Sequence, residues 1–113
     1  MKRDWEVIRD ILVKIENEDD ICASLSEYDE EKYQYHIKLL IESELIQGSI
    51  KKMVSGEVSC KVDRLTWKGH DFLDDIRSNS IWSKTKNILK EKGLGMSFEI
   101  IKKTAIKFAE EMI

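Results

Sequence analysis

The sequence predicts an α+β fold of about five helices with a small, three-stranded antiparallel sheet. Three observations favour this class. Apolar residues recur at helical spacing in several separate stretches of the 113-residue chain. Residues 46–53 and 58–65 are predicted as strands that flank the turn Ser55-Gly56, and the second strand alternates apolar and polar residues. The last helical stretch carries apolar residues three and four positions apart, the spacing of a helix–helix seam.

The composition fits one soluble domain, or one domain with an extension. Hydrophobic residues make up 42% of the chain and charged residues 36%, with a formal net charge of −3. No apolar run reaches the roughly 18 residues of a transmembrane helix. The N-terminus, Met1-Lys2-Arg3-Asp4-Trp5-Glu6, has no apolar signal core. We therefore expect a cytoplasmic protein with no membrane partner.

A first helix and a short strand are predicted before residue 26. Asp4 can cap the helix, whose apolar face is Trp5, Ile8, Ile11, Leu12 and Ile15. The acidic, turn-rich run Asn17-Glu18-Asp19-Asp20 ends it. Residues 21–25, Ile-Cys-Ala-Ser-Leu, are short and uncharged, so they read as a strand, although they could equally be a buried turn.

The central part is predicted as helix, hairpin and helix. Asp29–Glu44 is amphipathic and buries Tyr33, Ile37, Leu40 and Ile41. The two alternating strands follow. Thr66 then caps a further helix, and Gly69 is expected to let that helix approach the first one closely. The apolar area of this helix comes from Trp67, Phe72, Leu73 and Ile76.

Residues 32–46 resemble the recognition helix of winged-helix regulators of the ArsR/MarR/PadR type. His36-Ile37 takes the place of the His-Leu pair of that family, and Ser43-Glu44-Leu45-Ile46 the place of its small-Gly-Leu-Val exit. Glu44 stands where the family usually has a left-handed Gly, so we expect strain there or a different exit. Residues 65–69, Leu-Thr-Trp-Lys-Gly, match the Leu-Thr-x-x-Gly signature after the wing.

This resemblance implies a winged helix-turn-helix domain over residues 1–77. Its short first strand would pair beside the last, which would bring Cys22 and Cys60 close together as reduced, buried thiols. The whole chain also resembles a family of small bacterial and prophage proteins known only as a domain of unknown function. That likeness rests on the Met-Lys-Arg-Asp start, the His-x-Lys-Leu-Leu helix, the Leu-Thr-Trp-x-Gly-His motif and the closing helix. It implies fold and context but no activity.

Residues 78–113 form a predicted C-terminal helical extension. A basic helix, Ile81–Lys92, is broken at Gly93-Leu94-Gly95, and Ser97 caps the final helix. The heptad-spaced residues of that helix are Phe98, Ile101, Ala105, Phe108 and Met112. They can cover the protein's own core or form a homodimer seam. A membrane-surface role is the weaker alternative, because several glutamates offset the lysines.

No catalytic constellation is visible in the sequence. We therefore expect no enzyme, no cofactor and no metal site, since no Gly-rich phosphate loop or Cys/His ligand spacing occurs. His36 and His70 are interpreted as packed histidines. Trp5, Trp67 and Trp82 are interpreted as core anchors rather than base-stacking platforms, because each lies in an apolar stripe.

The distribution of charge bears on DNA binding, the function that the fold suggests. Residues 29–45 hold two lysines against five acidic residues, residues 46–65 hold four cations against two, and residues 78–113 hold seven lysines against four glutamates. The candidates for the major groove are Lys32, Gln34, Tyr35 and Lys38. The candidates for phosphate contacts are Lys51, Lys52, Lys61 and Arg64.

Two functions follow as hypotheses. The first is a DNA-binding transcriptional regulator of bacterial or prophage origin that binds duplex DNA, with a possible homodimer through the final helix. The second is a winged-helix module that binds a protein partner and no DNA, because one fold serves many functions.

Overall fold

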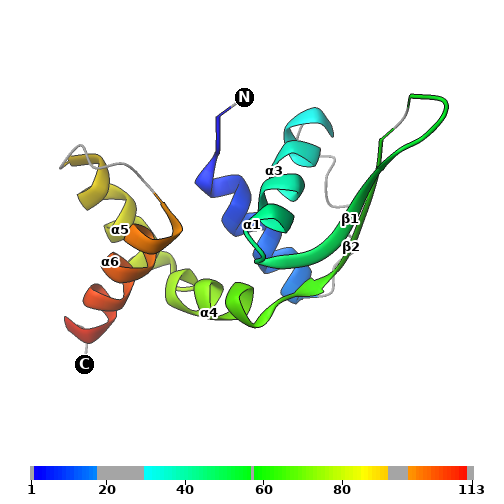
Figure 1. Cartoon of the computed structure of the whole chain (residues 1–113). Coiled ribbons are helices and arrows are strands. Elements are labelled where there is room, and N and C mark those ends of the chain that lie inside the picture. Colours follow the sequence, from blue (N-terminus) through cyan, green and yellow to red (C-terminus); the bar gives the residue numbers. More distant parts are fainter. Residues whose placement is uncertain (1, 18–29, 57, 92–96, 112–113) are drawn as a thin grey trace. The chain divides into compact units, whose positions relative to one another are not determined.

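The computed structural model describes residues 2–17, 30–56, 58–91 and 97–111. It confirms a mixed α+β chain, with five described helices and a two-stranded antiparallel sheet (Figure 1). In chain order the elements are α1 (Trp5–Glu16), α3 (Glu30–Glu42), β1 (Ile46–Lys52), β2 (Val58–Leu65), α4 (Trp67–Ile76), α5 (Asn79–Glu91) and α6 (Phe98–Glu111). The predicted strand at 21–25, with Cys22, lies outside the described residues, as do Gly93-Leu94-Gly95 and Met112.

The chain divides into two compact units, Met1–His70 and Asp71–Ile113. The division falls inside α4, whereas the sequence placed a boundary after Arg77. None of the described helices is long and apolar enough to cross a membrane.

Helix α1 begins at the predicted cap. The Asp4 carboxylate accepts hydrogen bonds from the backbone N–H groups of Glu6, at 3.0 Å, and Val7, at 3.4 Å. The helix buries a broad apolar face made of Trp5, Val7, Ile8, Ile11, Leu12 and Ile15. This face packs against α3 and β2, so α1 anchors the core of the first unit.

Helix α3 ends in a left-handed turn at a residue that is not glycine. It buries Tyr33, Ile37 and Leu40, while Ile41 is only half-buried. Glu44 has φ 64, and its N–H donates to the carbonyl of Ile41 at 3.0 Å. The N–H of Leu45 donates to the carbonyl of Leu40, also at 3.0 Å. These bonds form a Schellman motif with Glu44 at the position that glycine usually takes.

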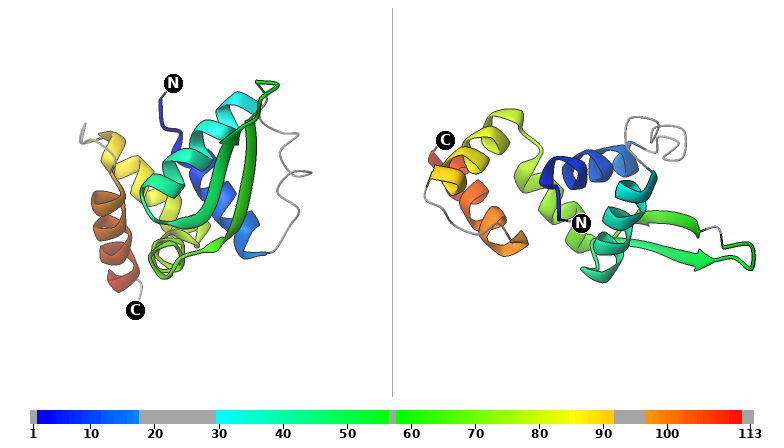
Figure 2. Two further views of the ribbon diagram at one scale, coloured as in Figure 1. Left: turned by 45° about the vertical axis from the view of Figure 1, so that its right-hand side comes forward. Right: turned by 90° about the horizontal axis from the view of Figure 1, so that it is seen from above.

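The hairpin of β1 and β2 extends past the helices of its own unit (Figure 2). Its register pairs Ser49 with Lys61 and Ile50 with Cys60, with an irregularity between Gln47 and Gly48. A Cβ on Gly48 would collide with the carbonyl oxygen of Lys61, so this crossing requires glycine.

The hairpin base closes on the exit of α3. Thr66 donates its N–H to the carbonyl of Leu45, at 3.0 Å, and its hydroxyl to the carbonyl of Glu44. The same hydroxyl caps α4, because it accepts from the N–H of Gly69 at 3.1 Å. The cap prediction is confirmed. The predicted partner of Gly69 was wrong: the carbonyl of Leu45, and not α1, occupies the space where a Cβ would stand.

The second unit contains a small core of its own. Helices α5 and α6 pack together, and Phe72 of α4 meets Phe98 of α6 edge to face at 4.9 Å between ring centroids. Ser97 caps α6 as predicted, because its hydroxyl accepts from the N–H of Ile100 at 3.2 Å. Thr85 of α5 is fully buried, and its hydroxyl has no hydrogen-bond partner among the described residues.

Candidate nucleic-acid interface

The outer face of the hairpin consists of Gln47, Ser49, Lys51, Lys61 and Arg64. Side chains alternate along a strand and directly paired residues share a face, so the register places these five residues together. All five are exposed. The opposite face carries residues that are buried or half-buried: Ile46, Gly48, Ile50, Cys60, Val62 and Leu65. The hairpin therefore has a core-directed side and a polar outer face.

Three cations share this outer face. Lys51 lies diagonally across the two strands from Lys61, a position at which side chains on one face still interact. The nearby acid is Asp63, whose carboxylate lies 3.8 Å from the Lys61 ammonium. Both side chains of this pair are well exposed, so the pair contributes little. The outer face therefore has a positive balance.

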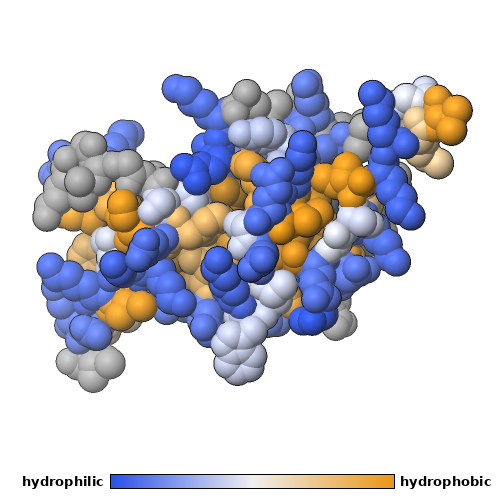
Figure 3. All heavy atoms as spheres, in the orientation of Figure 1, coloured by the Kyte–Doolittle hydropathy of each residue, from blue (hydrophilic) through white to orange (hydrophobic). Residues whose placement is uncertain are grey.

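The remaining hairpin candidate points elsewhere. Lys52 is exposed, but it lies on the core-directed side at the distal end of β1. Next to it, the tip exposes Met53 and Val54, and Figure 3 shows hydrophobic atoms gathered at this end of the hairpin. The apolar character of this tip was not predicted from the sequence.

Helix α3 has a different surface. The Lys32 ammonium forms an ion pair with the Asp4 carboxylate at 3.0 Å, so this candidate is engaged at the start of α1. Gln34 and Tyr35 are half-buried, and Lys38 is exposed. Three exposed acids, Glu31, Glu42 and Glu44, accompany them. The structure thus leaves Lys38 as the exposed cation of α3, beside an acidic surface.

His36 holds α1 and α3 together. It is fully buried, and its Nε2 accepts from the N–H of Asp4 at 2.8 Å. The neutral ring therefore carries its proton on Nδ1, which donates to the carbonyl of Lys32 at 2.7 Å. The prediction of a packed histidine is confirmed for His36, whose ring makes two hydrogen bonds.

His70 and Trp67 depart from the sequence interpretation. His70 is exposed, and its Nδ1 lies 3.8 Å from the carboxylate of Glu16. Trp67 is 82% exposed, so its prediction as a core anchor was wrong, whereas Trp5 and Trp82 are buried. A signal existed: residues 69, 72, 73 and 76 define the buried stripe of α4, and position 67 lies about 160° from position 69.

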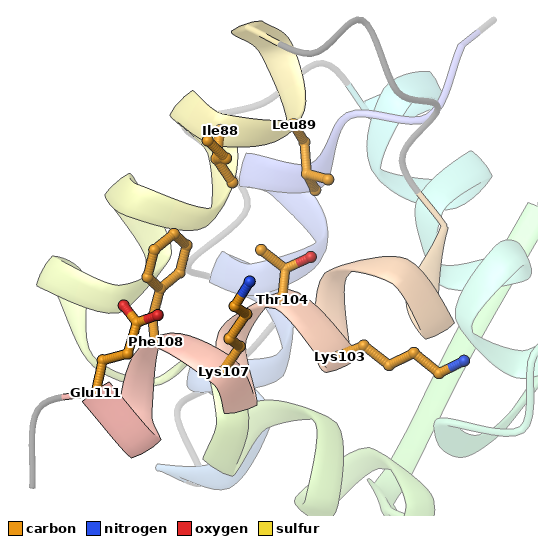
Figure 4. A pocket seen from close by; sticks show the side chains of 7 residues that line it. All are labelled: Ile88, Leu89, Lys103, Thr104, Lys107, Phe108 and Glu111. Carbon is orange, nitrogen blue, oxygen red and sulfur yellow. The ribbon is translucent and has the colours of Figure 1, made fainter.

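The predicted seam on α6 is partly covered within one chain. Ile101 and Ala105 are fully buried, and Phe98 packs on Phe72. Phe108 lines a pocket of about 310 Å³ together with Ile88 and Leu89 of α5 (Figure 4). These contacts favour a helix that folds back on its own unit. A homodimer through this seam stays a prediction.

The described part of the chain contains no candidate metal site. Among those residues, no group of three or more His, Cys, Asp or Glu side chains could hold a metal ion. Cys60 is half-buried, whereas the sequence predicted a buried thiol.

Comparisons with known proteins point to a family and not to an activity. A family model described as "Hypothetical protein (DUF2513)" matches residues 2–95. An "Uncharacterized protein" of Haemophilus influenzae (strain ATCC 51907 / DSM 11121 / KW20 / Rd) is similar to this chain. The two are 36% identical over 118 residues, which covers 100% of this chain and 99% of that protein. No solved structure matches the chain.

Proposed function

The chain belongs to the DUF2513 family, and we propose that it is a winged-helix regulator that binds duplex DNA mainly through its hairpin. The observation that carries this proposal is the outer face, where Lys51, Lys61 and Arg64 gather on one side of a projecting hairpin. The element order supports the winged-helix assignment, because the hairpin follows α3 and leads directly into α4.

The phosphate backbone of a nucleic acid is the ligand whose charge suits the outer face. Neighbouring cations on one face repel each other, and a phosphate backbone relieves that repulsion while releasing its own counterions. Ser49 and Gln47, which share the outer face with the cations, can donate hydrogen bonds to phosphate oxygens. Three phosphate contacts predict a slope of about −3 for log K against log salt concentration.

The surface of α3 argues for a secondary role of that helix. Glu31, Glu42 and Glu44 would meet phosphate charge unfavourably, and Lys32 is already paired with Asp4. Contacts of this helix with base edges would then fall to Gln34, Tyr35 and Lys38. In this proposal the hairpin supplies the affinity, and binding is only weakly dependent on sequence.

The test is the salt dependence of duplex DNA binding, measured by fluorescence anisotropy. The wild type is compared with Lys51→Glu/Lys61→Glu, which should bind at least tenfold more weakly and with a slope closer to zero by about 2. Lys84→Glu/Lys90→Glu is the matched control, because these exposed lysines of α5 carry the same charge change into the second unit. Equal weakening by both pairs, or no binding by wild type at low salt, would refute the proposal.

A second candidate is a protein-docking module that uses the acidic surface of α3. The observation that favours it is the set of exposed glutamates beside half-buried Tyr35, an aromatic residue of the kind that anchors interfaces. It predicts a basic protein partner whose binding is lost in Glu31→Lys/Glu42→Lys and kept in Lys51→Glu/Lys61→Glu. The opposite pattern of loss would exclude it.

A further inference from the structure

Among the described residues, Trp67 has the most exposed aromatic side chain. It is the first residue of α4, and 82% of its surface is accessible. Tryptophan normally buries much of its large apolar area, so a nearly free indole on a folded unit is unusual. Its backbone position is fixed, because Thr66 is bonded to the carbonyl groups of both Glu44 and Leu45.

Cationic residues flank Trp67 in the sequence. Arg64 precedes it by three residues on the outer face of the hairpin, and its guanidinium donates to the carbonyl of Leu65 at 3.1 Å. Lys68 follows it directly, and its ammonium donates to the carbonyl of Ser43 at 3.3 Å. Three residues of chain span at most about 10 Å, so Trp67 lies close to the end of the cationic outer face.

We propose that Trp67 is a stacking platform for an unpaired base of the nucleic acid that the hairpin holds. This inference rests on the proposed function, because Arg64 and Lys68 would hold the phosphates on either side of the stacked base. Exposed aromatic faces with flanking cations bind single strands in this way, since every base presents a flat face for stacking. The preferred ligand is therefore a duplex with a single-stranded tail or an opened step, rather than a blunt duplex.

The chain provides its own reporter for this contact. Trp5 and Trp82 are buried and Trp67 is exposed, so stacking on a base should quench mainly the emission of Trp67. Wild type is titrated with a blunt duplex and with the same duplex carrying an oligo(dT) tail, under observation of anisotropy and tryptophan emission. The expected result is tighter binding of the tailed duplex, by about tenfold, together with quenching.

Two variants complete the experiment. Trp67→Ala should lose the preference for the tail and the quenching, whereas Trp67→Phe should keep part of the preference because it retains an aromatic ring. An exposed residue contributes little to the core, so the thermal midpoint of Trp67→Ala should stay close to that of wild type. An equal preference for the tail in wild type and Trp67→Ala would overturn the inference.

The failure of this inference is distinguishable from that of the proposed function. If wild type binds the blunt duplex and Lys51→Glu/Lys61→Glu does not, hairpin binding stands even when Trp67 shows no quenching. Absent quenching would then overturn the assignment of Trp67 to a base. If neither duplex binds at low salt, both proposals fall together.

Discussion

Helix α3 and the hairpin leave the same corner of the first unit with opposite surface charge. The exposed side of α3 carries Glu31, Glu42 and Glu44 beside Lys38, whereas the outer face of the hairpin carries Lys51, Lys61 and Arg64 beside Asp63. In a winged-helix regulator the recognition helix is usually expected to make the main DNA contact. The contrast teaches that topology alone does not determine which element binds a ligand. The side-chain charge of each face matters as well.

The corner around Leu45 fixes the positions of both surfaces. The N–H of Leu45 closes the end of α3, its carbonyl accepts from Thr66, and the same carbonyl lies against Gly69. One short segment therefore fixes the exit of α3, the base of the hairpin and the first turn of α4. Substitutions at the corner should affect both surfaces, and substitutions on either surface should leave the other intact.

The largest effect is expected for Gly69→Ala. Alanine is normally the better helix former by about 1 kcal/mol, but its methyl group would collide with the carbonyl of Leu45, and we expect a net loss of about 3 kcal/mol. Urea unfolding measures this loss. Gly56→Ala is the control: its φ of 90 is strained for alanine, yet no atom lies within 4 Å of the new methyl group, so about 1 kcal/mol is expected. Equal losses would contradict the tight corner.

Single charge reversals compare the two surfaces directly. Lys51→Glu should weaken duplex binding about tenfold, or ~1.4 kcal/mol, because it removes a phosphate contact and adds repulsion. Lys38→Glu makes the same charge change on α3 and should weaken binding less than about twofold. Anisotropy at fixed low salt measures both. A larger effect of Lys38→Glu would move the main contact back to α3.

A stability change in the second unit tests whether binding depends only on the two surfaces. Thr85→Val replaces a buried hydroxyl without a described partner by a methyl group of similar shape, so we expect stabilisation by about 1 kcal/mol. Thermal unfolding measures this gain, and duplex affinity should not change. A loss of stability would mean that the hydroxyl of Thr85 is satisfied.

The smallest expected effect concerns the exit of α3. Glu44→Gly should stabilise the protein by about 0.5 kcal/mol, because glycine adopts the left-handed conformation without strain but has a more flexible unfolded state. Glu42→Gly, two residues earlier at the last residue of α3, should destabilise it by about 0.5 kcal/mol, less than a glycine in the helix interior would. Chemical denaturation of the pair checks the opposite signs, and equal signs would contradict the Schellman geometry.

Local chemistry allowed much of the first unit to be predicted from sequence. The caps at Asp4 and Thr66 each follow from one residue type in one position, and the strand bounds of β2 follow from its alternating pattern. The strand predicted over residues 46–53 was one residue too long, because β1 ends at Lys52. Such features depend on the neighbouring chain alone, which is why a single sequence reveals them.

Tertiary contacts could not be predicted in the same way. The sequence assigned Gly69 to α1, because it shows that a glycine permits close approach but not which backbone approaches it. Trp67 was assigned to the core because a tryptophan near an apolar stripe usually packs inward. The pairing of Lys32 with Asp4 joins two helices that are distant in sequence, and nothing in the spacing of α3 reveals it.

The proposal that the hairpin is the main DNA contact is tested most directly by amide chemical shifts of the protein titrated with duplex DNA. The largest shifts should fall on the outer face, at Ser49, Lys51 and Lys61, and fade with added salt. The amides of Gln34, Tyr35 and Lys38 on α3 should shift less. Shifts centred on α3, with the hairpin unchanged, would contradict the proposal that the hairpin is the main DNA contact.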